Sequence, residues 1–174
     1  EADIDQIILE PCKRNTAPAI AAAAAFIEQE KNCKDYLLFV LPADQIITDE
    51  FAFKSSLEKA LKAAKNDKFI IFGVKPHFAN TGFGYIKTYR LNKNTDAADV
   101  EKFVEKPDKT LAEKYLAHNL GLYEQGDPPC WFWNSGMFIL PKDLLAAELL
   151  KYGDNIWEAA KNSVKLGSRD LDFF

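Results

Sequence analysis

The sequence is poor in the residues from which disulfide and metal frameworks are built. Its three cysteines, Cys12, Cys33 and Cys130, lie far apart, and none forms a C-x-x-C pair. The two histidines, His77 and His118, are also far apart and lack the spacing of metal ligands. These absences argue against a disulfide framework and a structural zinc site. They indicate a reducing compartment, which we expect to be the cytoplasm.

Long apolar runs and an excess of positive charge are missing as well. No apolar run approaches the roughly 20 residues needed to cross a bilayer, and no signal peptide is visible. The 174 residues contain 22 Lys and Arg against 26 Asp and Glu, a net charge of −4. We therefore expect no nucleic-acid partner and no membrane partner. The sequence leaves the oligomeric state open, and a homo-oligomer is compatible with it.

Several well-known catalytic signatures are also absent. The chain has no G-x-x-x-x-G-K-[ST], no H-E-x-x-H and no G-x-S-x-G. A phosphate-loop ATPase, a zincin and a serine hydrolase are therefore unsupported. What remains is a chain with 48% hydrophobic and 28% charged residues, which is typical of a globular protein. Its length fits one domain, so we expect a single domain over residues 1–174.

Short apolar runs alternate with helical patterns along the chain. The runs at 35–44 and 68–74 are typical of strands buried on both faces, and an amphipathic helix at 49–65 separates them. The alanines of 21–25 suggest a helix that lies close against a sheet. This alternation indicates βαβ units. We predict an α/β fold, a three-layer α/β/α sandwich with a mostly parallel, Rossmann-like mixed sheet, in which ligands bind beyond the carboxyl ends of the strands.

Two short stretches at strand ends have the residue types of a binding site. Asp44 ends a buried strand, where its carboxylate can hold Mg²⁺, although a helix cap or a turn explains it equally well. Gly82 and Gly84 flank Phe83 at the start of another strand. Glycines at a strand entrance indicate either a bulge or a close approach of the backbone to a ligand.

The stretch "FVEKP" sets Glu105 and Lys106 before Pro107, which stops the strand. Taken alone, it also describes a solvated strand end followed by a turn. Glu105 can accept hydrogen bonds from hydroxyl groups, and Lys106 can supply a point charge for a phosphate. Because neighbouring residues of a strand point to opposite faces, the two side chains converge only if the chain bends at Pro107.

The stretch "WFWNSGMF" carries Asn134, whose carboxamide offers both a donor and an acceptor and suits the vicinal hydroxyls of a sugar. Trp131, Phe132 and Trp133 precede it. They can form an aromatic wall, and core packing is the favoured role for at least one of them.

Five segments together resemble a known family. "LEPCKRNTAPAIAAAA", "LPADQII", "FGVKPHFANTGFGYIK", "VEKFVEKPD" and "FWNSGMF" stand in the order found in bacterial mannose-1-phosphate guanylyltransferases. These enzymes are the GDP-mannose pyrophosphorylases, and they are often fused to a mannose-6-phosphate isomerase domain. The resemblance extends roughly from Ile7 to Trp157.

The resemblance implies transfer of GMP from GTP to mannose 1-phosphate, giving GDP-mannose and pyrophosphate with Mg²⁺ as cofactor. A sugar phosphate oxygen then attacks the α-phosphorus in line, so positioning and charge neutralisation replace a protein nucleophile. The implied roles are the nucleotide base side for Glu10, Arg14, Asn15 and Thr16, catalysis for Asp44 and Lys106, the Mg²⁺ ligand for Asp44, and the sugar-phosphate site for Gly84, Tyr85, Glu105, Lys106 and Asn134.

Departures from the family pattern qualify this expectation. The family's glycine-rich phosphate loop would precede residue 1, a second metal-binding Asp would follow residue 174, and Gln45 stands where members commonly have His. We therefore expect an incomplete nucleotidyltransferase domain that alone has little or no turnover. One alternative is a non-catalytic homologue that binds sugar nucleotides and regulates a partner. Another is a bifunctional parent with mannose-6-phosphate isomerase activity in a domain outside these residues.

Overall fold

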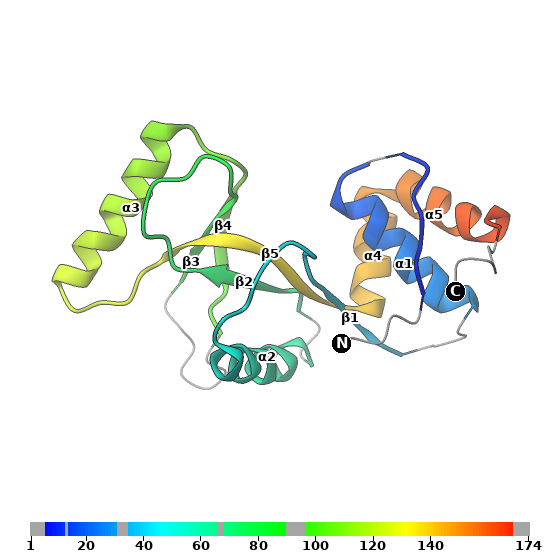
Figure 1. Cartoon of the computed structure of the whole chain (residues 1–174), viewed down its shortest axis with the longest axis horizontal. Coiled ribbons are helices and arrows are strands. Elements are labelled where there is room, and N and C mark those ends of the chain that lie inside the picture. The colour runs from blue at the N-terminus through cyan, green and yellow to red at the C-terminus, as the bar shows by residue number, and fades with distance from the viewer. Residues whose placement is uncertain (1–5, 13, 31–34, 66–67, 90–96, 169–174) are drawn as a thin grey trace. The chain divides into compact units, whose positions relative to one another are not determined.

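A computed structural model of the chain describes residues 6–12, 14–30, 35–65, 68–89 and 97–168, so Cys33 lies outside the described residues. The helices and strands, in chain order, are α1 (Thr16–Glu30), β1 (Leu37–Val40), α2 (Glu50–Ala64), β2 (Ile70–Val74), β3 (Tyr85–Thr88), β4 (Val100–Val104), α3 (Lys109–Glu124), β5 (Trp131–Pro141), α4 (Lys142–Tyr152) and α5 (Asp154–Leu166) (Figure 1). Within this described part, no helix has the length and apolar character required to cross a membrane.

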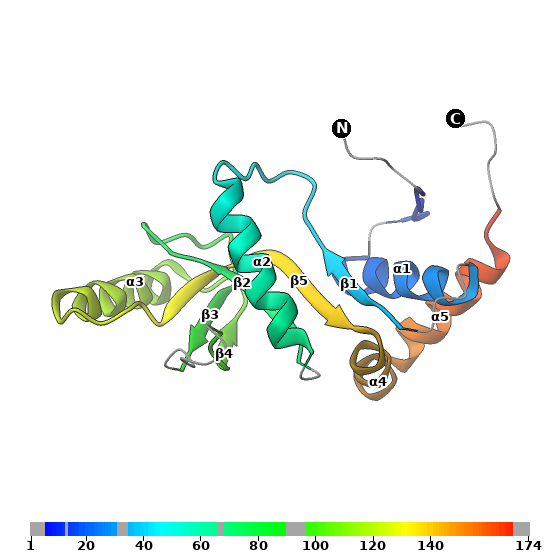
Figure 2. The same ribbon diagram turned by 90° about the horizontal axis from the view of Figure 1, so that it is seen from below.

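The chain divides into two compact units, residues 1–38 with 141–174 and residues 39–140. The first unit contains α1, α4 and α5, and α5 packs against both other helices. Ala21, Ala24 and Ala25 of α1 are buried, as is Trp157 of α5. The small side chains do permit a close approach, but the helix packs against α5 where we expected a sheet (Figure 2). Whether residues 1–174 form a single domain stays a prediction.

Five strands form one sheet in the order β1-β5-β3-β4, with β2 also paired to β5. The α/β class is thus confirmed. The mostly parallel character is not, because β2–β5, β3–β4 and β3–β5 are all antiparallel. The expected burial on both faces is also not found, because no residue of β1 or β2 is buried. An apolar run looks the same for either strand direction. The helix between β1 and β2 suggested a parallel crossover, whereas β2 pairs antiparallel with the much later β5.

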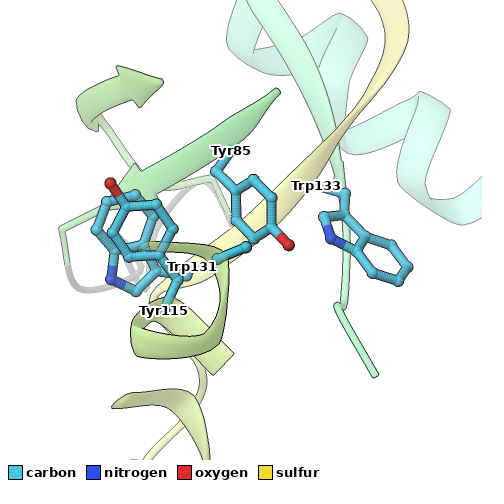
Figure 3. Packing of buried hydrophobic residues seen from close by; sticks show 5 residues of the cluster. Tyr85, Tyr115, Trp131 and Trp133 are labelled. Carbon is cyan, nitrogen blue, oxygen red and sulfur yellow. The ribbon is translucent and has the colours of Figure 1, made fainter. Parts of the chain in front are cut away.

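Helix α3 packs on an aromatic cluster at the start of β5. The cluster consists of Tyr85, Ala112, Tyr115, Trp131 and Trp133, all buried. Tyr115 and Trp131 stack with ring centroids 3.6 Å apart (Figure 3). Burial raises the pKa of the Tyr115 phenol. A second core lies under α2, where Ala60 and Ala64 contact Ile139 of β5. Strand β5 therefore contributes to both cores of its unit.

Asn119 ties α3 to the start of β5. Its side chain is 1% exposed. The Oδ1 atom accepts from the N–H groups of Cys130 and Trp131, and Nδ2 donates to the Trp131 carbonyl at 2.8 Å. The amide thus satisfies three backbone groups that no strand partner reaches from that side.

Replacing Asn119 with Ala should lower the free energy of unfolding by about 2–4 kcal/mol, because buried backbone groups lose their partners and a void remains. Urea denaturation measures this change. The control is Lys114→Ala at an exposed position of the same helix, which should change the stability by less than about 0.5 kcal/mol. Equal stability of the two variants would contradict the role assigned to Asn119.

Candidate functional site

A bulge in β5 shapes the centre of the candidate site. Ile71 faces Phe138 and Gly73 faces Asn134, so Phe72 alone stands opposite three residues of β5. Ser135 fills the resulting gap. Its hydroxyl donates to the Phe72 carbonyl at 2.7 Å and accepts from the Met137 N–H at 3.2 Å. The Ser135 hydroxyl thereby pairs one backbone group of each strand at the register shift.

The bulge also decides which atoms Asn134 can offer to a ligand. Gly136 has φ +76°, a left-handed conformation that favours glycine. Its N–H donates to Asn134 Oδ1 at 3.1 Å. Since an N–H needs an acceptor, this bond fixes the orientation of the carboxamide. One lone pair of Asn134 Oδ1 is therefore in use, and the NH₂ group and the second lone pair are left for a ligand. We call residues 134–136 the Asn134 bulge.

The loop from Leu41 to Asp49, the Asp44 loop, contacts the Asn134 bulge at two points. Gln45 Nε2 donates to the Ser135 carbonyl at 2.6 Å. The ring of Pro42 lies so close to Gly136 that a Cβ there would be 3.2 Å from Pro42 Cγ. Asp44 lies between these two contact residues and is exposed. The structure thus brings together the two stretches that the sequence placed in one site.

Glu105, Gly84 and Asn134 converge at the ends of β4, β3 and within β5. A Cβ at Gly84 would lie 2.9 Å from Glu105 Oε2 and 2.8 Å from the ring of Phe103. On the other side, the Asn134 N–H donates to the Gly84 carbonyl at 2.7 Å. Glycine therefore permits the carboxylate to lie over the backbone. The sequence suggested either a bulge or a close approach to a ligand. The close approach seen here is made by a protein side chain, and approach of a ligand stays a prediction.

Lys106 has φ +41°, a left-handed conformation that is uncommon for a residue with a side chain. This turn places Lys106 Nζ 3.7 Å from Glu105 Oε1, with both side chains more than half exposed. The bend that the sequence required is therefore present, and it lies at Lys106 while Pro107 is buried after it. Backbone strain of this kind is often found at functional sites.

Tyr85 differs from the other predicted sugar-site residues because its side chain is fully buried. Its hydroxyl accepts from the Asn80 N–H at 3.0 Å. Trp131 and Trp133 belong to the same aromatic cluster, so core packing accounts for both. Tyr85 can thus support the site through the loop before β3, whereas direct contact of its ring with a ligand stays a prediction.

A cavity of about 520 Å³ begins beside the Asn134 bulge. Phe132 and Gly73, the pairing partner of Asn134, both line it. Ile86, which pairs with Phe132 in β3, lines it as well. None of the predicted sugar-site residues, all of which are described, is part of its lining. The predicted sugar-site residues thus lie outside this cavity, and of the five only Glu105 and Lys106 are exposed.

The four residues expected at the nucleotide base lie in the other unit, and all are exposed. Glu10 and Arg14 precede helix α1, and Thr16 is its first residue. Asn15 has φ +66°, a left-handed conformation that Asn tolerates better than most residues. Arg14 Nε donates to Cys12 Sγ at 3.3 Å. The N-terminus of α1, a type of end that favours anions, thus carries the predicted nucleotide residues.

The expected Mg²⁺ requires carboxylate or other oxygen ligands from the protein. No three His, Cys, Asp or Glu of the described ranges lie close enough together to hold a metal ion. Asp44 provides an exposed carboxylate in a loop that is anchored by Pro42 on one side and Gln45 on the other. Mg²⁺ at nucleotide sites is commonly bound through one or two carboxylates together with phosphate oxygens. Asp44 fits that role.

Cys130 shows that a thiol is a poor nucleophile here. Burial raises the pKa of its thiol, and the carboxylate of Glu101 acts in the same direction. The thiol therefore stays protonated at neutral pH, and the thiolate is the reactive form. Glu101 is itself paired with Lys87 at 2.7 Å, and this hydrogen bond raises the pKa of the lysine.

Sequence reasoning missed Gln45 and Ser135, the two residues that join the Asp44 loop to the Asn134 bulge. Both stand directly beside a predicted site residue, and that adjacency is the signal that was available. Their roles depend on a bulge across strands far apart in the chain, which a single sequence does not reveal.

Comparisons with known proteins agree on one family. The family described as nucleotidyl transferase matches residues 4–174. The xanthan biosynthesis protein XanB of Xanthomonas campestris is 44% identical over 96% of this chain and 32% of its own length. A mannose-1-phosphate guanylyltransferase of Escherichia coli is 37% identical over 97% of this chain and 34% of its own. The chain thus spans about a third of these curated relatives.

Two solved structures share the fold. The crystal structure of a mannose-1-phosphate geranyltransferase from Thermus thermophilus has a TM-score of 0.74 at 26% identity, covering 93% of this chain and 43% of that one. That of a mannose-6-phosphate isomerase from Helicobacter pylori has a TM-score of 0.69 at 30% identity, covering 90% of this chain and 53% of that one.

Replacing Gly84 with Ala should force the exposed side chains of Glu105 and Phe103 away from the backbone, and because both can move, we expect the free energy of unfolding to fall by about 1 kcal/mol or less. Denaturant titration measures this. The matched control is Gly121→Ala in α3, where an added Cβ meets no atom within 4 Å. That change should stabilise the helix by up to about 1 kcal/mol. If both glycines respond alike, the contact of Gly84 with Glu105 does not constrain the fold.

Proposed function

This chain belongs to the nucleotidyl transferase family, and we propose that the protein is a mannose-1-phosphate guanylyltransferase. It would transfer GMP from GTP to mannose 1-phosphate, giving GDP-mannose and pyrophosphate. The observation that carries the proposal is the convergence of Gly84 before β3, Glu105 after β4 and Asn134 within β5. Two relatives that have this name are 37% and 41% identical over 97% of the chain.

The polar groups of the site complement a sugar phosphate. Glu105 supplies carboxylate oxygens that accept from hydroxyl groups, and the NH₂ of Asn134 donates to a hydroxyl oxygen. Lys106 provides the positive charge for the phosphate. Because the Glu105–Lys106 pair is exposed and its charged atoms are 3.7 Å apart, a ligand can take the place of that contact at little cost.

The triphosphate half of the reaction is assigned to other residues. We propose that Glu10, Arg14, Asn15 and Thr16 bind the base side of GTP, and that Asp44 is the protein ligand of Mg²⁺. Mg²⁺ at such a site neutralises phosphate charge and orients the reacting groups. The residues of this chain then hold the sugar phosphate and its attacking oxygen in line with the α-phosphorus. No protein nucleophile is required.

Further properties follow from the family and stay proposals. We infer a cytoplasmic protein. A homo-oligomer is compatible with the sequence, which does not fix the oligomeric state. Mannose-6-phosphate isomerase activity in another domain is retained as an alternative, because a structural neighbour carries that name. A non-catalytic sugar-nucleotide binder is the remaining alternative, and it would bind GDP-mannose without turnover.

Lys106→Met should raise the Kd for mannose 1-phosphate about 10- to 100-fold, because it removes a charge-assisted contact worth roughly 1.5–3 kcal/mol while keeping the apolar stem. Isothermal titration calorimetry measures the change. The control is Lys102→Met, which changes an exposed lysine of β4, the strand that precedes Lys106. It should bind as the unmodified protein does. Binding of unphosphorylated mannose should be equal in all three proteins. An unchanged Kd in Lys106→Met removes the phosphate role.

The protein, produced as its gene encodes it, should form GDP-mannose from GTP and mannose 1-phosphate in a Mg²⁺-dependent reaction. The 174 residues alone should show little or no turnover, as the resemblance predicts. Product formation is followed by anion-exchange chromatography and pyrophosphate release.

Asp44→Asn should lower kcat/KM at least about 100-fold, since the site loses its metal-binding carboxylate. The matched control is Asp127→Asn, an exposed aspartate in the turn after α3. GDP-mannose binding without any turnover in the encoded protein would favour the regulatory alternative. Ample turnover from the 174 residues alone would refute the expectation of inactivity.

A further inference from the structure

We propose that Gln45 is a positioning residue, which holds the Asp44 loop against the Asn134 bulge. It would thereby keep the metal-binding carboxylate aligned with the sugar phosphate. This inference rests on the proposed function, because it concerns the alignment of two parts of the same site.

The Asn134 bulge is a rigid platform for such a contact. Ser135 is 6% exposed, and its hydroxyl bonds both to the Phe72 carbonyl and to the Met137 N–H. Asn134 Oδ1 accepts from Gly136 on the same bulge. These bonds use side chains and backbone on both sides of the register shift. The carbonyl of Ser135 is therefore held in a fixed direction.

Gln45 uses that carbonyl. Its Nε2 donates to the Ser135 oxygen at 2.6 Å, across 90 residues of sequence. The second contact of the loop, between Pro42 and Gly136, is apolar and close, because a Cβ at Gly136 would lie only 3.2 Å from the proline ring. One contact is thus a directional hydrogen bond, and the other is a steric stop.

Asp44 depends on these two contacts for its position. It lies one residue before Gln45 and two residues after Pro42, so its backbone is restrained on both sides. Its exposed side chain leaves the carboxylate open to solvent. In a transfer reaction without a protein nucleophile, alignment supplies much of the rate. A displacement of about 1 Å at a positioning contact can reduce the rate about 100-fold.

The test compares Gln45→Ala and Gln45→Glu with the unmodified protein, all produced as the gene encodes them. Gln45→Glu keeps the shape of the side chain but replaces the N–H donor with an oxygen. The control is Gln125→Ala, an exposed glutamine that follows α3. The measurements are kcat, the KM for mannose 1-phosphate, the Mg²⁺ concentration for half-maximal rate, the Tm, and ¹⁵N relaxation order parameters of residues 43–46.

We expect both Gln45 variants to lower kcat about 10- to 100-fold and to raise the half-maximal Mg²⁺ concentration. The KM for mannose 1-phosphate should stay within about twofold, because Glu105, Lys106 and Asn134 are untouched. The Tm should fall by less than about 3 °C, since only one partly buried hydrogen bond of an exposed loop residue is lost. Order parameters in the loop should fall from about 0.85 toward 0.6, measured without ligand.

Three results would overturn the proposal. The first is an Asp44 loop that keeps its order in both Gln45 variants. The second is a loop that loosens while kcat stays unchanged. The third is a fall in kcat and Tm together with a rise in KM, which indicates a structural role only. If the unmodified protein makes no GDP-mannose, the proposed function fails. The order parameters then still decide whether Gln45 holds the loop.

Discussion

The candidate site depends on how the protein joins two strands of unequal length. Where β2 contributes Phe72, β5 contributes residues 135–137, and a regular ladder leaves the surplus backbone groups without partners. Unpaired buried backbone groups are expensive, so the register shift needs a local substitute. Ser135 provides it, because one hydroxyl donates to one strand and accepts from the other. A hydroxyl group suits this buried position, because it can both donate and accept.

The same register shift sets the chemistry of its neighbours. Gly136 adopts a left-handed conformation, and its N–H takes the acceptor of Asn134. This bond fixes the orientation of the Asn134 carboxamide, whose NH₂ group and second oxygen lone pair stay available. Gly84, which accepts from the Asn134 backbone, brings Glu105 into the same place. Asn134 and Glu105 thus lie on either side of Gly84, one with a carboxamide and the other with a carboxylate.

The sequence predicted the members of this site better than the sheet that carries them. Glu105, Gly84 and Asn134 were assigned to strand ends, and they do meet. The reasoning assumed parallel strands, whose carboxyl ends share one edge, whereas the described registers are antiparallel. Apolar runs reveal a buried strand but not its direction, because side chains alternate in the same way in both. The gathering was therefore predictable from residue types and their resemblance to a family, and the topology was not.

Other features required contacts that no single sequence displays. Tyr85 was expected in the sugar pocket, and its side chain lies in the aromatic cluster, bonded to Asn80. Tyr85 stands in a strand directly after Gly84, and this pattern is the same for a tyrosine in the core and for one that contacts a ligand. The sequence required a bend at Pro107 in "FVEKP". The bend lies at Lys106, whose left-handed backbone conformation cannot be read from the amino-acid composition.

The two ion pairs of the β3–β4 hairpin region differ in length and exposure, and the longer, more exposed one consists of two residues proposed to bind the sugar phosphate. Lys87 and Glu101 lie 2.7 Å apart with about a third of each side chain exposed, and this pair joins the two strands. Glu105 and Lys106 are 3.7 Å apart and about twice as exposed. Solvent reaches both pairs, and the shorter, less exposed Lys87–Glu101 pair links two strands whose backbones are already paired. A loose, exposed pair is worth at most about 1 kcal/mol, so a ligand with hydroxyls and a phosphate can replace it. The strained turn at Lys106 keeps the two groups near each other without binding them firmly, which is the property that a site for an exchanging substrate needs.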